Sequence, residues 1–201
     1  MRDIITARIS DEPGIRVTVP GSGSQTLPTD ESHLIAQVVT AAADAAGVEV
    51  TGLEIECVNT IPQGRGMGSS ASAIAAGLVI ARELFAPSLT DAQLVARATV
   101  MEGHADNVSA CLLGGLTVAH WDTLEDVRAV SLPVHPEVTA IVAVPDGQLA
   151  TTHARGMLPA QVPYSDAVFN ASRAATLIAA MTYDPGLLLE ATADRLHQDY
   201  R

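Results

Sequence analysis

The residues best suited to chemistry form a glycine-rich string between a predicted strand and a predicted helix. The string reads Pro62-Gln63-Gly64-Arg65-Gly66-Met67-Gly68-Ser69-Ser70-Ala71-Ser72. Glycine at every second position permits positive φ and removes Cβ, so backbone N–H groups can approach an anion closely. The two serines at the helix start add unpaired amides and the positive end of the helix dipole. The string predicts a phosphate-binding loop, and a turn that merely caps the helix is the alternative.

A second polar run, Glu102-Gly103-His104-Ala105-Asp106-Asn107, interrupts two predicted helices. A carboxylate in such a run would suit Mg²⁺, which prefers hard oxygen ligands, with the other polar groups holding a substrate. The alternative is that Asp106 or Asn107 simply caps the following helix. His104 has no second histidine nearby, so the run predicts no zinc site.

The charge and composition exclude several classes of protein. The net charge of -12 disfavours nucleic acid as a partner, because such binding depends on basic side chains. The sequence contains no Lys, which excludes a Walker-type phosphate loop, the strand Lys of protein kinases and Schiff-base chemistry on the chain. No apolar run reaches membrane-spanning length and the first residues lack a signal-peptide pattern, so we expect a cytoplasmic protein with no membrane partner. Cys57 and Cys111 are expected to be buried structural thiols.

Short strands and helices must position the two polar runs. The expected strands are residues 4–9, 15–19, 50–58, 116–121, 127–132 and 138–144. The expected helices are residues 71–85, 108–113, 164–181 and 185–197, one that starts at Thr90 or Asp91 and ends near residue 101, and one that ends at residue 46 and is capped by Thr29, Asp30 or Ser32. Strands and helices mix without strict alternation, which favours an α+β fold.

The glycine-rich string resembles the central motif of the GHMP kinases, Pro-x-x-x-Gly-Leu-Gly-Ser-Ser-Ala, with Met67 where Leu is usual. This resemblance implies that residues 62–72 wrap the phosphates of ATP and that Ser70 contacts Mg²⁺. It also implies a GHMP-kinase-like fold, with a ribosomal protein S5 domain 2-like N-terminal part and the start of a ferredoxin-like C-terminal part. We therefore expect an ATP-binding domain over residues 1–140 and the beginning of a second domain over 141–201.

The polar run resembles the homoserine kinases within that superfamily, which carry a Glu, then His-x-Asp-Asn, then a Gly-Gly turn. The resemblance implies Glu102 as a Mg²⁺ ligand. It implies that His104, Asp106 and Asn107 lie near the substrate L-homoserine, with Asn107 facing the hydroxyl that is phosphorylated. Because an Asn cannot deprotonate an alcohol, the proton would pass to a phosphate oxygen or to water.

Two further segments agree with the same family. Thr151 to Pro159 resembles its Thr-x-x-x-Arg-x-x-Leu-Pro segment, where Arg155 would bind the substrate carboxylate and Thr151 would hydrogen-bond nearby. On the sequence alone, Arg155 would instead be a surface residue of a helix. The end of the chain resembles the family's Leu-His-x-x-Tyr-Arg pattern and implies Arg201 as a second carboxylate-binding residue.

Family members are longer at both ends, so we expect the chain to be truncated. Missing strands would leave sheet edges and apolar faces open, so we also expect that the chain can associate with itself as a homodimer. The resemblance leaves two alternatives to an active homoserine kinase. One is another GHMP kinase that acts on mevalonate or a sugar, which an Asp in place of Asn107 would have favoured. The other is a non-catalytic nucleotide-binding fragment.

Overall fold

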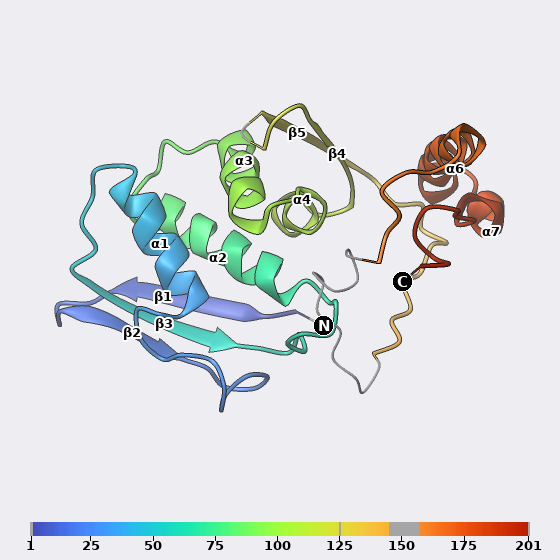
Figure 1. Ribbon diagram of the computed structural model, residues 1–201. Coiled ribbons are helices and arrows are strands. Elements are labelled where there is room, and N and C mark those ends of the chain that lie inside the picture. Colours follow the sequence, from blue (N-terminus) through green and yellow to red (C-terminus); the bar gives the residue numbers. More distant parts are fainter. Residues whose placement is uncertain (1, 125, 145–156, 201) are drawn as a thin grey trace. The chain divides into compact units, whose positions relative to one another are not determined.

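The computed structural model describes residues 2–124, 126–144 and 157–200 (Figure 1). The chain forms two compact units, Met1–Ser131 and Leu132–Arg201. The units divide before the boundary that we expected at residue 140, and their assignment to family domains stays a prediction. Among the described residues, no helix is long and apolar enough to span a membrane.

The first unit is built on a three-stranded sheet. Its strands are β1 (Ile4–Ile9), β2 (Gly14–Thr18) and β3 (Gly52–Val58), in the order β1-β3-β2. β1 pairs antiparallel with β3, whereas β2 runs parallel to β3. A parallel pair requires a crossover connection, and the chain between β2 and β3 supplies it as helix α1 (Leu34–Asp44). The predicted alternation of β3 is confirmed, because Leu53, Ile55 and Cys57 are buried.

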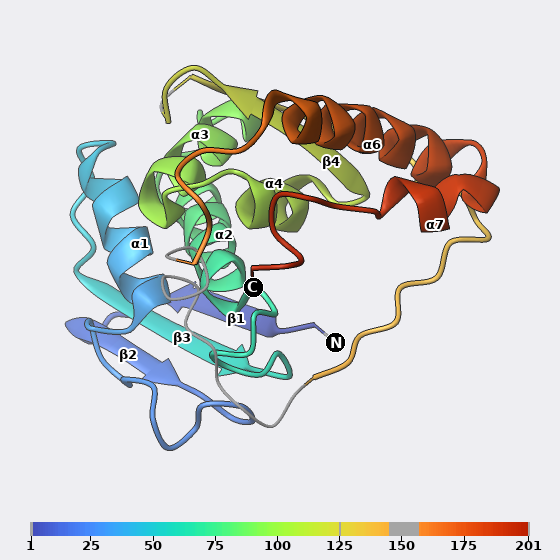
Figure 2. The same ribbon diagram turned by 45° about the vertical axis from the view of Figure 1, so that its right-hand side comes forward.

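Two helices cover one face of this sheet. Helix α1 and helix α2 (Ser69–Leu84) lie side by side over the strands in both views (Figures 1 and 2). They pack closely because Gly77 of α2 has no side chain. A Cβ added there would lie 2.7 Å from Val38 Cβ. Small residues on α2 thus bring the helix that follows the glycine-rich loop directly onto α1.

The rest of the first unit carries the second polar run. Helices α3 (Asp91–Glu102) and α4 (Asp106–Leu113) lead into a hairpin of β4 (Leu116–Trp121) and β5 (Val127–Leu132). α3 begins where predicted, since Thr90 and Gln93 form a capping box. α3 ends at Gly103, which has φ of 83°. Its end and the start of α4 thus bracket residues 103–105.

Helix α1 begins later than predicted. His33 is its cap, and Nδ1 of His33 accepts a hydrogen bond from the Ile35 amide. The expected caps were wrong because Asp30 is used elsewhere. Its carboxylate accepts hydrogen bonds from both the amide and the hydroxyl of Ser32, which closes a turn before the helix.

The second unit contains α6 (Tyr164–Thr182), the 3₁₀ turn η1 (Pro185–Leu187) and α7 (Leu188–Ala191). The helix predicted to reach residue 197 is wrong, because α7 ends at Ala191 and residues 196–198 form no helix. The Asp194 carboxylate accepts hydrogen bonds from the amides of residues 196, 197 and 198 instead. The strand predicted over 138–144 is also wrong. Those residues pair with no strand of the described chain, and Ile141 is 92% exposed.

The two cysteines differ. Cys57 is buried under the helices, and burial raises the pKa of its thiol to about 11. Cys111 of α4 is exposed, so its expected burial was wrong. Val108 and Leu112 occupy the buried face of this short helix, and Cys111 lies at the edge of that face. Apolar neighbours in sequence did not determine which side of the helix Cys111 occupies.

Candidate active site

The glycine-rich loop joins β3 to α2 and has the backbone that its glycines predict. Gly64, Gly66 and Gly68 adopt φ of 65°, 70° and 74°. Helix α2 starts at Ser69, two residues before the predicted start, and Gly68 is its cap without a side-chain hydrogen bond. The first turn of the helix therefore has no side-chain acceptor at this cap. Amides in such a turn are donors for an anion, because they have no partner within the helix.

Ser70 and Glu102 meet across the first unit. The Ser70 hydroxyl donates a 2.8 Å hydrogen bond to Oε2 of Glu102, which is the last residue of α3. The Glu102 side chain is only 13% exposed. The two residues that the resemblance implies as Mg²⁺ ligands thus place their oxygens within contact of one another.

His104 lies on the other side of Glu102. Its Nε2 is 3.8 Å from Oε1 of Glu102, and its Nδ1 contacts Oδ1 of Asp106. His104 therefore lies between two carboxylates.

The start of α4 brings Asn107 to the loop. The helix cap is Ala105, not Asp106 or Asn107 as in the capping alternative. Oδ1 of Asp106 accepts a hydrogen bond from the backbone N–H of Asn107. The side-chain Cγ of Asn107 lies 3.9 Å from the position that a Cβ on Gly68 would take. The second polar run and the glycine-rich loop therefore form one site.

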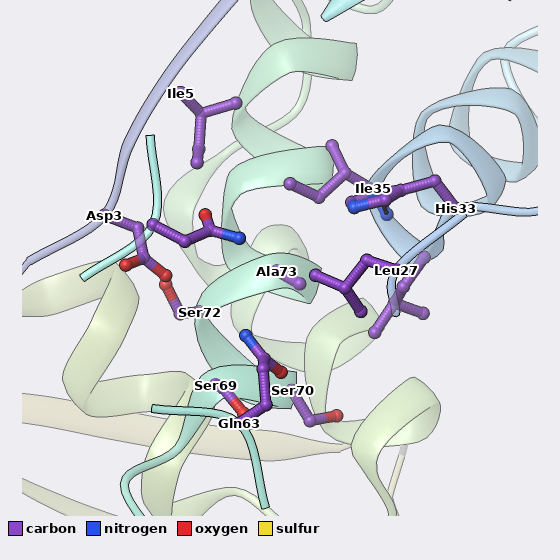
Figure 3. Close-up of a pocket in the computed structure, with 12 residues that line it drawn as sticks. Asp3, Ile5, Leu27, His33, Ile35, Gln63, Ser69, Ser70, Ser72 and Ala73 are labelled. Carbon is purple, nitrogen blue, oxygen red and sulfur yellow. Dashed lines mark hydrogen bonds between the residues drawn. The ribbon is translucent and has the colours of Figure 1, made fainter. Parts of the chain in front are cut away.

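A cavity of about 150 Å³ adjoins the start of α2 (Figure 3). Ser69, Ser70 and Ser72 lie on one side, and apolar side chains of Ile5, Leu27 and Ile35 contribute to the rest. Sequence reasoning missed three polar residues of its lining: Asp3, His33 and Asn59. No motif marks them, since they lie just before β1, just after β3 and at the cap of α1. Only the packing of these elements brings them together.

Asp3, next to β1, forms hydrogen bonds with the segment that leads into the glycine-rich loop. Its Oδ1 accepts hydrogen bonds of 2.7 and 2.9 Å from the amides of Thr60 and Ile61. These amides lie just before Pro62, so Asp3 fixes the point at which the loop leaves β3. The remaining predicted residues, Thr151, Arg155 and Arg201, lie outside the described residues.

The donor set suits Mg²⁺ only with help from a substrate. In the described part of the chain, no group of three or more His, Cys, Asp or Glu side chains could hold a metal. Ser70 and Glu102 offer two oxygen ligands. This is compatible with Mg²⁺, which usually takes one or two protein oxygens and completes its shell with phosphate oxygens and water.

Sequence comparison places this site in a known family. Residues 33–115 match the GHMP kinases N terminal domain. The chain is 46% identical over 202 residues to the homoserine kinase of Streptomyces coelicolor, which covers 99% of this chain and 65% of that protein. The chain belongs to the GHMP kinase family. A homoserine kinase of Mycobacterium tuberculosis is 42% identical over 94% of this chain.

Solved structures agree with this membership. The GHMP kinase chain superposes on homoserine kinase from Cytophaga hutchinsonii with a TM-score of 0.80 at 28% identity, covering 99% of this chain and 65% of the other. Streptococcus pneumoniae phosphomevalonate kinase has a TM-score of 0.65 at 12% identity, which shows a common fold alone. The predicted α+β, GHMP-kinase-like fold is confirmed. The chain spans about 65% of the length of the relatives that it matches.

Proposed function

We propose that the protein is a homoserine kinase that transfers the γ-phosphate of ATP to the hydroxyl of L-homoserine. The product would be O-phospho-L-homoserine, in threonine biosynthesis in the cytoplasm. One observation carries the proposal, the 2.8 Å hydrogen bond between Ser70 and Glu102 beside the glycine-rich loop. Relatives at 40–46% identity that are named homoserine kinases support the choice of substrate.

The loop and the start of α2 would bind the phosphates of ATP. Backbone amides of residues 64–70 would supply the donors, and the dipole of α2 would favour the negative charge. Ser70 and Glu102 would hold Mg²⁺, which when bound neutralises charge on the β- and γ-phosphates. Because Glu102 is largely buried, its carboxylate would act in a medium where charge interactions are stronger than in water.

Asn107 would orient the acceptor hydroxyl. In the transfer, the hydroxyl oxygen bonds to the γ-phosphorus while the bond from that phosphorus to the β-bridging oxygen breaks. ADP leaves, and the hydroxyl proton passes to a phosphate oxygen or to water, because a neutral amide does not accept it. Positioning and charge stabilisation supply most of the acceleration in such transfers.

The amino-acid end of L-homoserine would be held by charged residues. His104 contacts the Asp106 carboxylate, which also accepts from the Asn107 backbone amide, and both His104 and Asp106 would contact this end. Thr151, Arg155 and Arg201 would bind its carboxylate, with Arg155 in a two-pronged contact. Association as a homodimer remains a prediction.

A coupled assay of ADP release tests the proposal. Release should rise when L-homoserine is added and should not rise with mevalonate. Arg155→Ala should increase the KM for L-homoserine while sparing ATP binding. Release that is independent of L-homoserine would refute the proposed substrate, and an unchanged KM would remove Arg155 from the site.

A further inference from the structure

Side-chain hydrogen bonds continue the junction of β1 with β3 beyond the last backbone pair of the two strands. Thr60 Oγ1 accepts a hydrogen bond of 3.0 Å from the Arg2 amide and donates one of 2.7 Å to the Arg2 carbonyl oxygen. Oδ1 of Asp3 accepts hydrogen bonds from the amides of Thr60 and Ile61. The junction therefore extends to the residue before the glycine-rich loop.

The two bonds to Asp3 control the direction in which the chain enters the loop. Hydrogen bonds to a carboxylate are shorter and stronger than those to a neutral acceptor. Each peptide unit is planar, so two consecutive N–H groups that point to one oxygen fix the orientation of two adjacent planes. The bonds of Thr60 to Arg2 hold the strands together but leave these planes unconstrained, because they involve only the Thr60 side chain.

The loop itself depends on its two ends for its position. Within the ranges that the structure describes, the amides of Gly66, Met67 and Gly68 donate no backbone hydrogen bond. Such donors suit an anion, but glycines are permissive, so a segment with few bonds of its own is easily displaced. At the helix end, Ser70 bonds to Glu102. At the strand end, the corresponding carboxylate is that of Asp3.

We propose that Asp3 is a positioning residue, which holds the glycine-rich loop in the conformation that receives the phosphates of the nucleotide. The inference rests on the proposed function. A carboxylate that faced the phosphates would repel them. Because the Asp3 carboxylate binds the amides that precede the loop, it acts on the nucleotide through the loop and not by contact. Loss of its acceptor oxygen would allow the loop amides to shift, and a displacement of about 1 Å at a remote position can cost about 100-fold in rate.

Three substitutions separate positioning from stability. Asp3→Ala removes the acceptor, whereas Asp3→Asn retains an oxygen in the same place. Thr60→Val is the matched control, because it removes the bonds to Arg2 at the same junction and leaves the Thr60 amide on Asp3. We expect Asp3→Ala to bind Mg-ATP about 10-fold more weakly and to lose about 100-fold in kcat/KM for ATP. Asp3→Asn should stay within about 3-fold of wild type in both.

Calorimetric titration with Mg-ATP and steady-state kinetics, each at a temperature well below the melting transition, make the test. Thr60→Val should melt earlier than wild type yet bind Mg-ATP equally well. If Asp3→Ala does not fold, Asp3→Glu, which displaces the carboxylate by one methylene, should show the same kind of loss. A lower melting temperature with unchanged Mg-ATP affinity in the Ala or Glu variant would overturn the inference, as would equal losses in Asp3→Asn and Asp3→Ala. Failure of wild type to bind Mg-ATP at all would instead remove the proposed function, and this inference with it.

Discussion

The hydroxyl of Ser70 donates a 2.8 Å hydrogen bond to the carboxylate of Glu102, although 32 positions separate the two residues. Ser70 lies in the first turn of α2 and Glu102 at the end of α3. Packing of α3 against α2 brings a carboxylate to the positive end of the α2 dipole. A divalent cation bound by both oxygens would be held at the mouth of the glycine-rich loop, where the phosphates of a nucleotide are expected.

Asn107 should affect catalysis more than nucleotide binding. Its side chain lies beside Gly68, and the proposed function makes it a contact of the acceptor hydroxyl. Asn107→Ala should lower kcat by about 100-fold, because misplacement of a reacting group by an ångström costs that much. The KM for ATP should change little. Steady-state kinetics with each substrate varied in turn would measure both effects, and a rise in the ATP KM at constant kcat would contradict the assigned role.

Gly77 should be intolerant of a side chain. A Cβ there would lie 2.7 Å from Val38 Cβ and 3.1 Å from the Ile35 carbonyl oxygen. Helix propensity favours Ala over Gly by about 1 kcal/mol, but overpacking typically costs about 1–3 kcal/mol. We expect Gly77→Ala to lower the free energy of unfolding by about 1–2 kcal/mol in urea titrations. Val38→Ala makes room for the new methyl group, so in that background Gly77→Ala should lower the free energy of unfolding by less. A Gly77→Ala protein that is more stable than wild type would contradict the close packing of α1 on α2.

Asp194 should make the second unit sensitive to acid. Burial alone would raise the pKa of its carboxyl, but hydrogen bonds from the Gln198 and His197 amides and from Asn170 bring it below its ordinary value. A lowered pKa in the folded state gives stability that is present above the unfolded value of about 3.9 and lost as the pH falls. Asp194→Asn should therefore lower the melting temperature at pH 7 and have a smaller effect at pH 3, because the stabilisation begins to fall below about pH 4 and is lost fully only as the pH falls through the folded pKa. An equal effect at both pH values would show that the charge is not involved.

The local elements of the site could be predicted from sequence. Alternating glycines indicated a turn with positive φ, and the structure has it at Gly64, Gly66 and Gly68. Thr90 indicated the start of α3 through its capping box. Such features depend on neighbours within a few residues, which the sequence displays directly.

Two local hydrogen-bond choices and one distant contact could not be predicted. His33 caps α1 in place of Asp30, because the Asp30 carboxylate bonds to Ser32. The helix predicted to reach residue 197 ends at Ala191, and the amides of residues 196–198 donate to the Asp194 carboxylate instead of continuing it. The meeting of Ser70 and Glu102 was implied only through family resemblance, since the sequence alone does not show how α2 packs on α3.

The most direct test of the account is the Mg²⁺ dependence of ATP binding, measured by calorimetry in wild type and Glu102→Gln. Glu83→Gln on α2 is a matched control, because its side chain is 67% exposed and distant in sequence from both polar runs. Wild type and the control should bind ATP more tightly with Mg²⁺ than with a chelator, because the cation joins the phosphate oxygens to the protein oxygens. Glu102→Gln should lose most of this difference while retaining its metal-free affinity. Full Mg²⁺ dependence in Glu102→Gln would contradict the claim that Ser70, Glu102 and the glycine-rich loop form one magnesium–nucleotide site.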